Sequence, residues 1–446
     1  MRVGVFGTGH VGLPTAAALA HLGHDVVATD VDSEKLSALS LGRLPFYEPG
    51  LEELVRGELA SGRLRFSANP SATVTDRQIV FVCVGTPPRA SGEANLLALE
   101  RAAEIIGRHA TGDLVVVEKS TVPAGTAGRM QETLTRYNRR VSFAIVSNPE
   151  FLREGCAVEV SLQPGRILVG SDSAEALTVM RGLYAPLIEL GVRWIETDVR
   201  TAELAKHACN AFLAMKISYA NALARICELA GADVVAVADA MGADPRIGRA
   251  YLDAGLGYGG YCFPKDVAAF ERLAARLGYR FGLLEEVARI NQQAVEFAVQ
   301  KVEEVLWNLE DKRIVLLGLA FKPGTDDVRF APALEVARLL LAGGAAVVGY
   351  DPQAGGTAKA ELPQLEIAAD AYTALEGAHC AIICTEWPEF RDLDLDRAMA
   401  LMSFPILLDG RNLYTGDAAE SIARAGFTYL ATGRTPRTAG PPAFAR

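Results

Sequence analysis

Cys262 lies in the segment from Gly255 to Asp266, GLGYGGYCFPKD, where four glycines precede a thiol and a lysine and an aspartate follow it. Glycine lets a ligand or another stretch of backbone approach closely. A nearby lysine such as Lys265 favours the thiolate, the nucleophilic form of cysteine. A free cysteine is more often a small buried hydrophobic residue, so this segment alone leaves a structural role open. A nucleophilic thiol beside a nicotinamide would indicate oxidation through a covalent thioester.

The start of the chain contains a motif that could hold that nicotinamide. Residues 7–12, GTGHVG, follow the GxGxxG pattern between a strand-like run at residues 2–6 and an alanine-rich helix at residues 14–22. Glycine backbone and a helix N-terminus together hold a pyrophosphate. Asp30 ends the next strand-like run, where an acid binds the ribose 2′-hydroxyl and repels a 2′-phosphate. The motif therefore predicts NAD in preference to NADP, and the alternative is a glycine turn with a surface aspartate.

Polar residues on one long helix form a second candidate group. Lys206 and Asn210 are four residues apart in a run without Gly or Pro from Thr201 to about Leu229, so they share a helix face, with Glu203 close to it. A buried lysine beside an amide can stabilise an oxyanion. An exposed polar stripe is the alternative. The length and apolar character of the helix predict a domain connector or an oligomer interface.

Further polar residues follow strand-like runs, where open α/β sheets place their ligand loops. SNPEFLREG, after the run at residues 143–147, carries Glu150 and Glu154, which can serve as a general base and a substrate clamp or as capping residues. Thr121 places a hydroxyl after another such run.

The second α/β half carries GLAFKPG at residues 318–324 after its first strand, without the GxGxxG spacing. Lys322 and Arg329 can contact phosphates, although a solvated loop is the alternative. A doubly wound domain without the motif indicates that it binds a nucleotide portion of the substrate, not a second cofactor.

The alternation of strands and helices predicts parallel sheets with helices on both faces. We therefore predict an α/β protein with two Rossmann-like doubly wound domains joined by a long central helix. The predicted parts are an NAD-binding domain at residues 1–198, a central helical and dimerisation region with the cysteine loop at 199–309, a C-terminal Rossmann-like domain at 310–432 and a flexible tail at 433–446. The strand-like runs are residues 2–6, 25–30, 79–84, 114–118, 143–147, 167–169, 313–319, 345–350, 381–385 and 406–408.

Composition restricts the partners and the compartment. The 446 residues carry a formal net charge of -10, which gives no electrostatic case for nucleic acid or an anionic membrane. No apolar run reaches the roughly 18 residues of a membrane span, and we expect no signal peptide because the chain opens on a strand. The seven cysteines form no CxxC pair, so we expect reduced thiols, no metal site and a cytoplasmic location.

Together these segments resemble the UDP-glucose/GDP-mannose dehydrogenase family of nucleotide-sugar 6-dehydrogenases, from residue 1 to about residue 432. The resemblance implies oxidation of a sugar CH2OH to a carboxylate with two NAD and one water. The shared motifs are GTGHVGL, YEPGL, FVCVGTPP, EKSTVPAGT, SNPEFLREG, ELAKHACNAFLAMKIS, GYGGYCFPKDV, GLAFKPGTDDVR, TEWPEF and DGRNLY.

The resemblance also implies roles for particular residues. Cys262 resembles the nucleophile that forms a thiohemiacetal and then a thioester, Lys206 and Asn210 the pair that stabilises the oxyanion, and Arg246 an arginine offered across a dimer interface. The catalytic set is Cys262, Lys206, Asn210, Asp266, Glu150 and Thr121, the last three ordering and deprotonating water. The cofactor set is Gly7, Gly9, Val11, Gly12, Asp30, Lys35, Thr86, Thr121, Glu154, Lys265 and Arg329. The substrate set is Phe151, Leu152, Glu154, Lys206, Asn210, Arg246, Tyr251, Gly259, Lys322 and Arg411.

The chain departs from the family pattern in places that bear on the substrate. Tyr261 stands where serine is usual, Phe330 and Ala331 replace Glu-Ser, Gly165 replaces a common acidic residue and His207 is often tyrosine. We expect UDP-glucose as substrate and a homodimer or higher homo-oligomer. The alternatives are dTDP-glucose or GDP-mannose with the same chemistry, a two-electron hydroxyacid-type dehydrogenase, and a non-catalytic NAD-binding protein.

Overall fold

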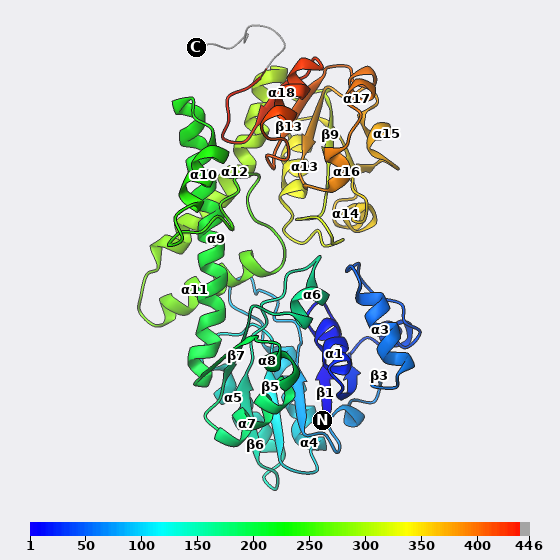
Figure 1. The fold of residues 1–446 in the computed structure, drawn as a ribbon, viewed down its shortest axis with the longest axis vertical. Helices are drawn as coiled ribbons and strands as arrows, with labels where there is room; N and C mark the ends of the chain where they lie inside the picture. The colour runs from blue at the N-terminus through cyan, green and yellow to red at the C-terminus, as the bar shows by residue number, and fades with distance from the viewer. Residues whose placement is uncertain (438–446) are drawn as a thin grey trace. The chain divides into compact units, whose positions relative to one another are not determined.

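The computed structural model describes residues 1–437, which form two compact units (Figure 1). The N-terminal unit comprises Met1–Cys209 with Ala268–Tyr279, and the C-terminal unit comprises Asn210–Val267 with the residues from Arg280 on. No helix in the described part of the chain is long and apolar enough to cross a membrane.

The N-terminal unit contains one eight-stranded sheet with the strand order β3-β2-β1-β4-β5-β6-β7-β8. Strands β1 to β6 run parallel, whereas β7 is antiparallel to β6 and β8 is parallel to β7. The predicted parallel sheet therefore holds for six strands, and the short β3 and the half-exposed β8 were not predicted. The strands are β1 Arg2–Phe6, β2 Asp25–Thr29, β3 Leu64–Phe66, β4 Ile79–Val82, β5 Leu114–Glu118, β6 Phe143–Ser147, β7 Arg166–Gly170 and β8 Arg193–Thr197.

Helices cover both faces of this sheet. In β4, Ile79 and Phe81 belong to one apolar cluster, and Val80 and Val82 belong to the other. Side chains of a strand alternate between the two faces, so an uninterrupted apolar strand needs a helix layer on each side. The helices are α1 Gly12–His21, α2 Ser33–Ser40, α3 Leu51–Ala60, α4 Leu97–His109, α5 Thr126–Tyr137, α6 Ala157–Leu162, α7 Ala174–Leu183 and α8 Ala185–Glu189, with a 3-10 turn at Pro70–Thr73.

The C-terminal unit contains a six-stranded, fully parallel sheet with the order β11-β10-β9-β12-β13-β14. The same alternation appears in its central strand, where Ile314 and Leu316 face one apolar cluster and Val315 and Leu317 face the other. The strands are β9 Arg313–Leu317, β10 Ala346–Tyr350, β11 Glu366–Ile367, β12 Cys380–Ile383, β13 Ile406–Asp409 and β14 Thr428–Ala431. The helices are α10 Val234–Gly242, α12 Gly282–Leu306, α13 Pro332–Ala342, α14 Gly355–Glu361, α15 Ala371–Leu375, α16 Pro388–Arg391, α17 Leu395–Leu401 and α18 Asp417–Arg424.

Two helices contribute residues to both units: α9 at Val199–Ala230 and α11 at Cys262–Arg276. Asp198 precedes α9 and accepts a hydrogen bond from the Thr201 backbone N–H at 2.9 Å, which satisfies one donor of the first turn. The predicted class, two doubly wound α/β parts connected by a long helix, is confirmed. The boundaries of the three predicted domains remain a prediction.

The predicted flexible tail begins at Gly433, and its described part is folded. The Gly433 N–H donates to Glu228 at 2.7 Å, and the buried Arg434 donates to Asp233 and to the Tyr414 carbonyl at 3.1 and 2.7 Å. Residue 437 pairs with β14 through two backbone hydrogen bonds. The prediction is therefore wrong for residues 433–437, because side chains of the C-terminal unit bind them. Residues 438–446 lie outside the described residues.

Candidate functional site

The turn after β1 has the geometry of a dinucleotide-binding turn. Gly7 has a φ of +91°, and a Cβ there would lie 2.6 Å from the Cys83 carbonyl oxygen. A Cβ on Gly12 would lie 1.9 Å from the Gly7 carbonyl oxygen, so both positions require glycine. A Cβ on Gly9 would meet nothing within 4 Å. The turn is thus tightly packed at Gly7 and Gly12 and open at Gly9. The open position fits the close approach of a pyrophosphate.

Asp30 follows β2 and is held by donors from both sides. Its Oδ2 accepts hydrogen bonds from the Thr8 backbone N–H and hydroxyl at 2.8 Å each and from Lys35 Nζ at 2.7 Å. Burial alone would raise the pKa of Asp30, but the hydrogen bonds from Lys35 and Thr8 hold that pKa below its ordinary value. The side chain is only 12% exposed, which rules out the free surface aspartate that was the alternative. Thr8, which the sequence reasoning missed, fixes this carboxylate.

The loop after β5 brings Thr121 to Thr86, which lies between β4 and α4. The buried Thr86 hydroxyl donates to the Thr121 carbonyl at 3.0 Å. The next residue, Val122, has its carbonyl 2.9 Å from Nε2 of His207 on α9. Glu203, also on α9, accepts hydrogen bonds from two backbone N–H groups at the start of α5, at 2.6 and 2.9 Å. Helix α9 therefore fixes the loop that carries Thr121.

Glu150 and Lys206 form a buried ion pair in the N-terminal unit. Lys206 Nζ donates to the Glu150 carbonyl oxygen at 2.6 Å and to Glu150 Oε1 at 2.9 Å, and the two side chains are 5% and 6% exposed. The Leu152 N–H donates to the other carboxylate oxygen at 2.5 Å. The Phe151 ring centroid lies 5.2 Å from Lys206 Nζ. Because Lys206 and Asn210 are both buried, the exposed polar stripe offered as an alternative is excluded.

Glu48 is a buried carboxylate to which the sequence reasoning gave no role. It accepts hydrogen bonds from the Gly155 and Ala157 N–H groups at 2.8 and 2.7 Å. These bonds attach the Tyr47–Leu51 loop to the segment that carries the half-buried Glu154. The sequence signal for a role of Glu48 was its place in the YEPGL motif, where it stands between two turn-forming segments.

In the C-terminal unit, Cys262 is the first residue of α11, and its side chain is half-buried. Asp266, one helical turn later, is fully buried. Its two carboxylate oxygens accept hydrogen bonds from Lys265 Nζ at 2.5 Å and from the Asn210 side-chain amide at 2.6 Å. The structure thus brings Asn210 of α9 to Asp266, which lies with Lys265 about one turn after the cysteine on α11.

The glycine loop before Cys262 packs against the loop that follows β9. A Cβ on Gly259 would lie 2.4 Å from the Phe330 carbonyl oxygen, and a Cβ on Gly260 would lie 2.7 Å from the Phe321 ring. Glycine is therefore required here for the close approach of a second segment, as the sequence indicated.

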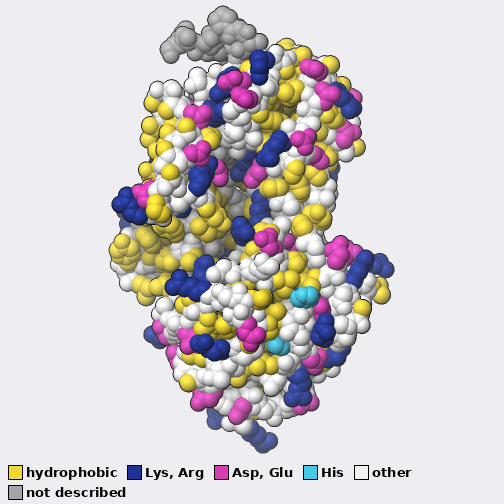
Figure 2. Space-filling model, in the orientation of Figure 1, with side chains coloured by type: hydrophobic (Ala, Val, Ile, Leu, Met, Phe, Trp, Pro, Cys, Tyr) yellow, Lys and Arg dark blue, Asp and Glu magenta, His cyan; other side chains and the backbone are white. Residues whose placement is uncertain are grey.

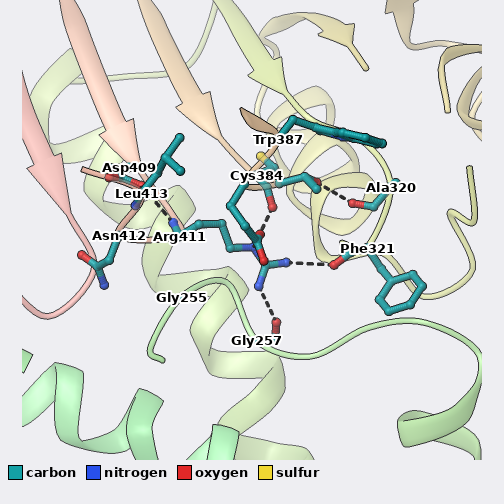
Figure 3. A network of polar contacts seen from close by, with 12 residues as sticks. Gly255, Gly257, Ala320, Phe321, Cys384, Trp387, Asp409, Arg411, Asn412 and Leu413 are labelled. Carbon is teal, nitrogen blue, oxygen red and sulfur yellow. Dashed lines mark hydrogen bonds and ion pairs between the residues drawn. The ribbon is translucent and has the colours of Figure 1, made fainter. Parts of the chain in front are cut away.

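Arg411 fixes the same loop, as Figure 3 shows. Its guanidinium donates to the carbonyl oxygens of Cys384, Gly257 and Phe321 at 2.7, 3.1 and 3.4 Å. Sequence reasoning assigned Arg411 to the nucleotide-sugar. In the structure its contacts hold three backbone segments together, and contact with substrate remains a prediction.

The other predicted residues of the C-terminal unit have different neighbours. Arg329 forms an ion pair with Asp327 at 2.6 Å, and Lys322 is half-buried. Tyr251 has a φ of +66°, an unusual value for a bulky residue, and its ring centroid lies 6.3 Å from that of Phe263. The Arg246 side chain is 87% exposed and pairs with an aspartate two residues away.

In the part of the chain that the structure describes, no group of three or more His, Cys, Asp or Glu side chains could hold a metal ion.

Each unit thus holds a distinct subset of the predicted residues. The N-terminal unit holds Gly7, Gly9, Val11, Gly12, Asp30, Lys35, Thr86, Thr121, Glu150, Phe151, Leu152, Glu154 and Lys206, and the C-terminal unit holds Asn210, Arg246, Tyr251, Gly259, Cys262, Lys265, Asp266, Lys322, Arg329 and Arg411.

Models of three protein-family domains match this chain. The NAD binding domain of the UDP-glucose/GDP-mannose dehydrogenase family matches residues 1–188. The central domain of that family matches residues 200–293, and its UDP binding domain matches residues 315–416.

Whole-length relatives agree with these matches. The chain is 41% identical to the UDP-glucose 6-dehydrogenase TuaD of Bacillus subtilis over 97% of this chain and 93% of that one. It is 42% identical to the UDP-glucose 6-dehydrogenase of Rhizobium meliloti over 97% and 100% of the two chains. Among solved structures, a UDP-glucose dehydrogenase from Pyrobaculum islandicum superposes with a TM-score of 0.91 at 38% identity, covering 97% and 98% of the chains.

The matched domains extend over most of the chain, and the turn at Gly7–Gly12 has the geometry that an NAD binding domain needs. The chain belongs to the UDP-glucose/GDP-mannose dehydrogenase family and is an NAD-dependent oxidoreductase.

Proposed function

We propose that the chain oxidises the C6 hydroxymethyl group of UDP-glucose to the carboxylate in two oxidation steps, with Cys262 as covalent nucleophile. The observation that carries this proposal is the place of Cys262: a thiol at the first residue of α11, one turn from the buried Asp266 and its two donors. A two-electron dehydrogenase has no use for such a thiol. The whole-length relatives, which bear the name UDP-glucose 6-dehydrogenase, support the substrate.

The residues around Gly7–Gly12 would hold the cofactor. Gly9 leaves room for the pyrophosphate, and the ionised Asp30 offers an acceptor to a ribose hydroxyl. Lys265 and Arg329 are two further residues that we assign to the cofactor. When bound, NAD accepts a hydride from the sugar carbon, once for each of two cofactor molecules per turnover.

Lys206 and Asn210 are proposed to stabilise the oxygen at C6. They lie one turn apart on α9, and each has a carboxylate partner that orients it, Glu150 for the ammonium and Asp266 for the amide. We propose that the Lys206 ammonium and the Asn210 amide each donate a hydrogen bond to the developing alkoxide. Preorganised donors of this kind stabilise the charge that develops in the transition state.

Cys262 adds to the C6 aldehyde and forms a thiohemiacetal. A helix N-terminus favours negative charge, so the first position of α11 favours the thiolate needed for that addition. Loss of the second hydride from C6 leaves a thioester on the sulfur. Water, ordered by Thr121, Glu150 and Asp266, then attacks the thioester carbonyl, and the thiolate leaves. In total, RCH2OH, two NAD+ and one water give RCOO−, two NADH and three protons.

The test is a substrate panel of UDP-, dTDP- and GDP-hexoses with the NADH yield and the acid product measured per sugar. We expect UDP-glucose to give the highest kcat/KM and about two NADH per uronate formed. A Cys262→Ser variant should accumulate a covalent sugar adduct, visible as a mass increase of the protein, because an oxygen ester hydrolyses slowly. A yield of one NADH per sugar would sink the covalent scheme. A clear preference for dTDP-glucose, the first competitor, would move the substrate assignment to that nucleotide.

The exposed side of α9 supports the predicted homodimer. Apolar residues recur there at alternating spacings of three and four residues, the pattern of two helices packed along a seam. Hydrophobic side chains also gather on the visible face over the area of α9 and α11 (Figure 2). The stripe consists of Phe212, Met215, Tyr219, Ala222, Ile226 and Leu229, of which four are 52% to 76% exposed.

Light scattering tests this assembly. We expect a dimer or a multiple of it for the wild type, and dissociation for an Ile226→Asp variant, because a buried unpaired charge is unfavourable at a packed interface. The matched control is Leu190→Asp, an exposed leucine at the end of α8 and outside α9. A fully active wild-type monomer would contradict the proposal.

A further inference from the structure

Tyr261, the residue directly before Cys262, lies within cation–π distance of two cations. The guanidinium carbon of Arg329 is 4.5 Å from the centroid of its ring, and Lys265 Nζ is 5.6 Å away. The ring is half-buried. A serine at this position would have no ring and could make neither contact.

Each of the two cations is also held by a carboxylate. Arg329 donates to both oxygens of Asp327, at 2.8 and 2.6 Å, and Lys265 donates to Asp266 at 2.5 Å. Each cation therefore has an anion and the Tyr261 ring as neighbours. Burial raises the pKa of the Tyr261 phenol, against the opposing effect of Arg329, so the ring stays neutral and keeps the electron-rich face that attracts cations.

The backbone before the ring is fixed as well. Gly260 has a φ of +76°, and a Cβ on it would lie 2.7 Å from the ring of Phe321. Arg411 holds the carbonyl of Gly257 in the same loop. The loop is thus closely packed against the segment that also carries Arg329, and the Tyr261 ring is held beside that arginine.

We propose that Tyr261 is a positioning residue that keeps Arg329 and Lys265 in place for the bound cofactor. The inference rests on the proposed function, which assigns both cations to NAD. It goes beyond that function by giving the residue next to the nucleophile a role in cofactor affinity. It also gives a role to a residue in which this chain departs from the usual motif.

Titration of NADH fluorescence on the full-length protein tests the proposal without any turnover. Tyr261→Phe keeps the ring and should bind NADH within about twofold of the wild type. Tyr261→Leu keeps an apolar side chain without a π face and should bind about three- to tenfold more weakly. In steady-state assays the KM for NAD should rise by a similar factor, with the KM for UDP-glucose and kcat within about twofold of the wild type. Unchanged thermal unfolding of both variants would show that the fold is intact.

A double-mutant cycle identifies the partner through which the ring acts. The loss caused by Tyr261→Leu should shrink in an Arg329→Met or a Lys265→Met background, because one contact is already gone. Wild-type affinity of Tyr261→Leu, equal weakness of the Phe and Leu variants, or an undiminished loss in both backgrounds would overturn the proposal. A chain that binds NADH in this pattern but does not oxidise UDP-glucose would defeat the proposed function and leave this inference standing.

Discussion

The first six strands of the N-terminal sheet and the six strands of the C-terminal sheet share one parallel strand order, but the two sheets use the same structural position differently. Counted from the first strand of each sheet, Asp30 and Asp351 both follow the second strand. Both accept the N–H of the residue just after a positive-φ glycine, Thr8 after Gly7 and Leu319 after Gly318. The two turns therefore begin alike.

The difference lies in what else binds the carboxylate. Asp30 has Lys35 as a flexible partner at a partly open turn. Asp351 is buried and accepts hydrogen bonds from three further backbone N–H groups, of Ala320, Gln353 and Ala354, and from the indole of Trp387, at 2.8 to 3.0 Å. A saturated carboxylate has little capacity left for a ribose hydroxyl. The comparison explains why the N-terminal turn suits a dinucleotide and the C-terminal turn does not.

The largest expected effect separates the covalent step at Cys262 from cofactor binding at the Gly7–Gly12 turn. Cys262→Ala should lower the rate of uronate formation by more than about a thousandfold, because the covalent step is lost. The Kd for NADH should stay within about twofold, since the dinucleotide turn is untouched. Product analysis and NADH titration measure the two quantities. Wild-type turnover by this variant would show that the thiol has no covalent role.

The glycine turn should respond to a methyl group according to its position. Gly12→Ala places a Cβ against the Gly7 carbonyl and should lower the free energy of unfolding by about 2 kcal/mol or more and abolish measurable NADH binding. Gly9→Ala has open space in the unliganded turn, so its stability should be near that of the wild type, with NADH affinity about tenfold or more lower. Denaturant unfolding and NADH titration would measure both. Equal effects of the two substitutions would contradict this assignment of roles within the turn.

The paired aspartates provide the direct test of the comparison. Asp30→Ala should weaken NAD binding about tenfold and reduce discrimination against NADP, with little loss of stability. Asp351→Asn should leave NADH affinity unchanged and destabilise the protein by about 1–3 kcal/mol, because buried N–H donors lose an acceptor. If Asp351→Asn weakened NADH binding as strongly as Asp30→Ala, the two turns would not have separate functions.

The smallest effect concerns a second pair of acids, Glu118 at the end of β5 and Asp409 at the end of β13. Asp409 accepts three backbone N–H groups and the Tyr429 hydroxyl. The Glu118 oxygens are buried without such donors, and burial and then the neighbouring Glu203 raise the pKa of Glu118 well above its ordinary value.

A raised carboxyl pKa means that the folded state holds a proton that the unfolded state releases. Stability should therefore fall as the pH rises above the ordinary glutamate pKa of about 4.3. Glu118→Gln should remove part of that slope and raise the free energy of unfolding at pH 8 by about 1 kcal/mol, with a smaller gain at pH 4. Urea unfolding at the two pH values measures the difference. A variant that is less stable than the wild type at pH 8 would contradict this account.

Local sequence determined the features that depend on a few adjacent residues. GxGxxG with Asp30 predicted the dinucleotide turn, because glycine alone tolerates the positive φ at Gly7 and the close carbonyl at Gly12. The uninterrupted run before Leu229 predicted α9, and the glycines around Cys262 predicted close backbone approach. The alternation of strands and helices predicted two doubly wound parts, because a chain with this alternation has few other ways to bury both faces of each sheet.

Only the tertiary structure decided which distant polar groups meet. Lys206 and Glu150 are 56 residues apart in the sequence, and no local pattern pairs them. The Arg411 guanidinium binds distant backbone carbonyls, and Arg434 is bound to Asp233 about 200 residues away. The antiparallel direction of β7 could not be predicted from the local sequence either. Such pairings depend on how the helices and loops pack around the completed sheets, because a buried charge or N–H group must find a partner wherever the fold supplies one.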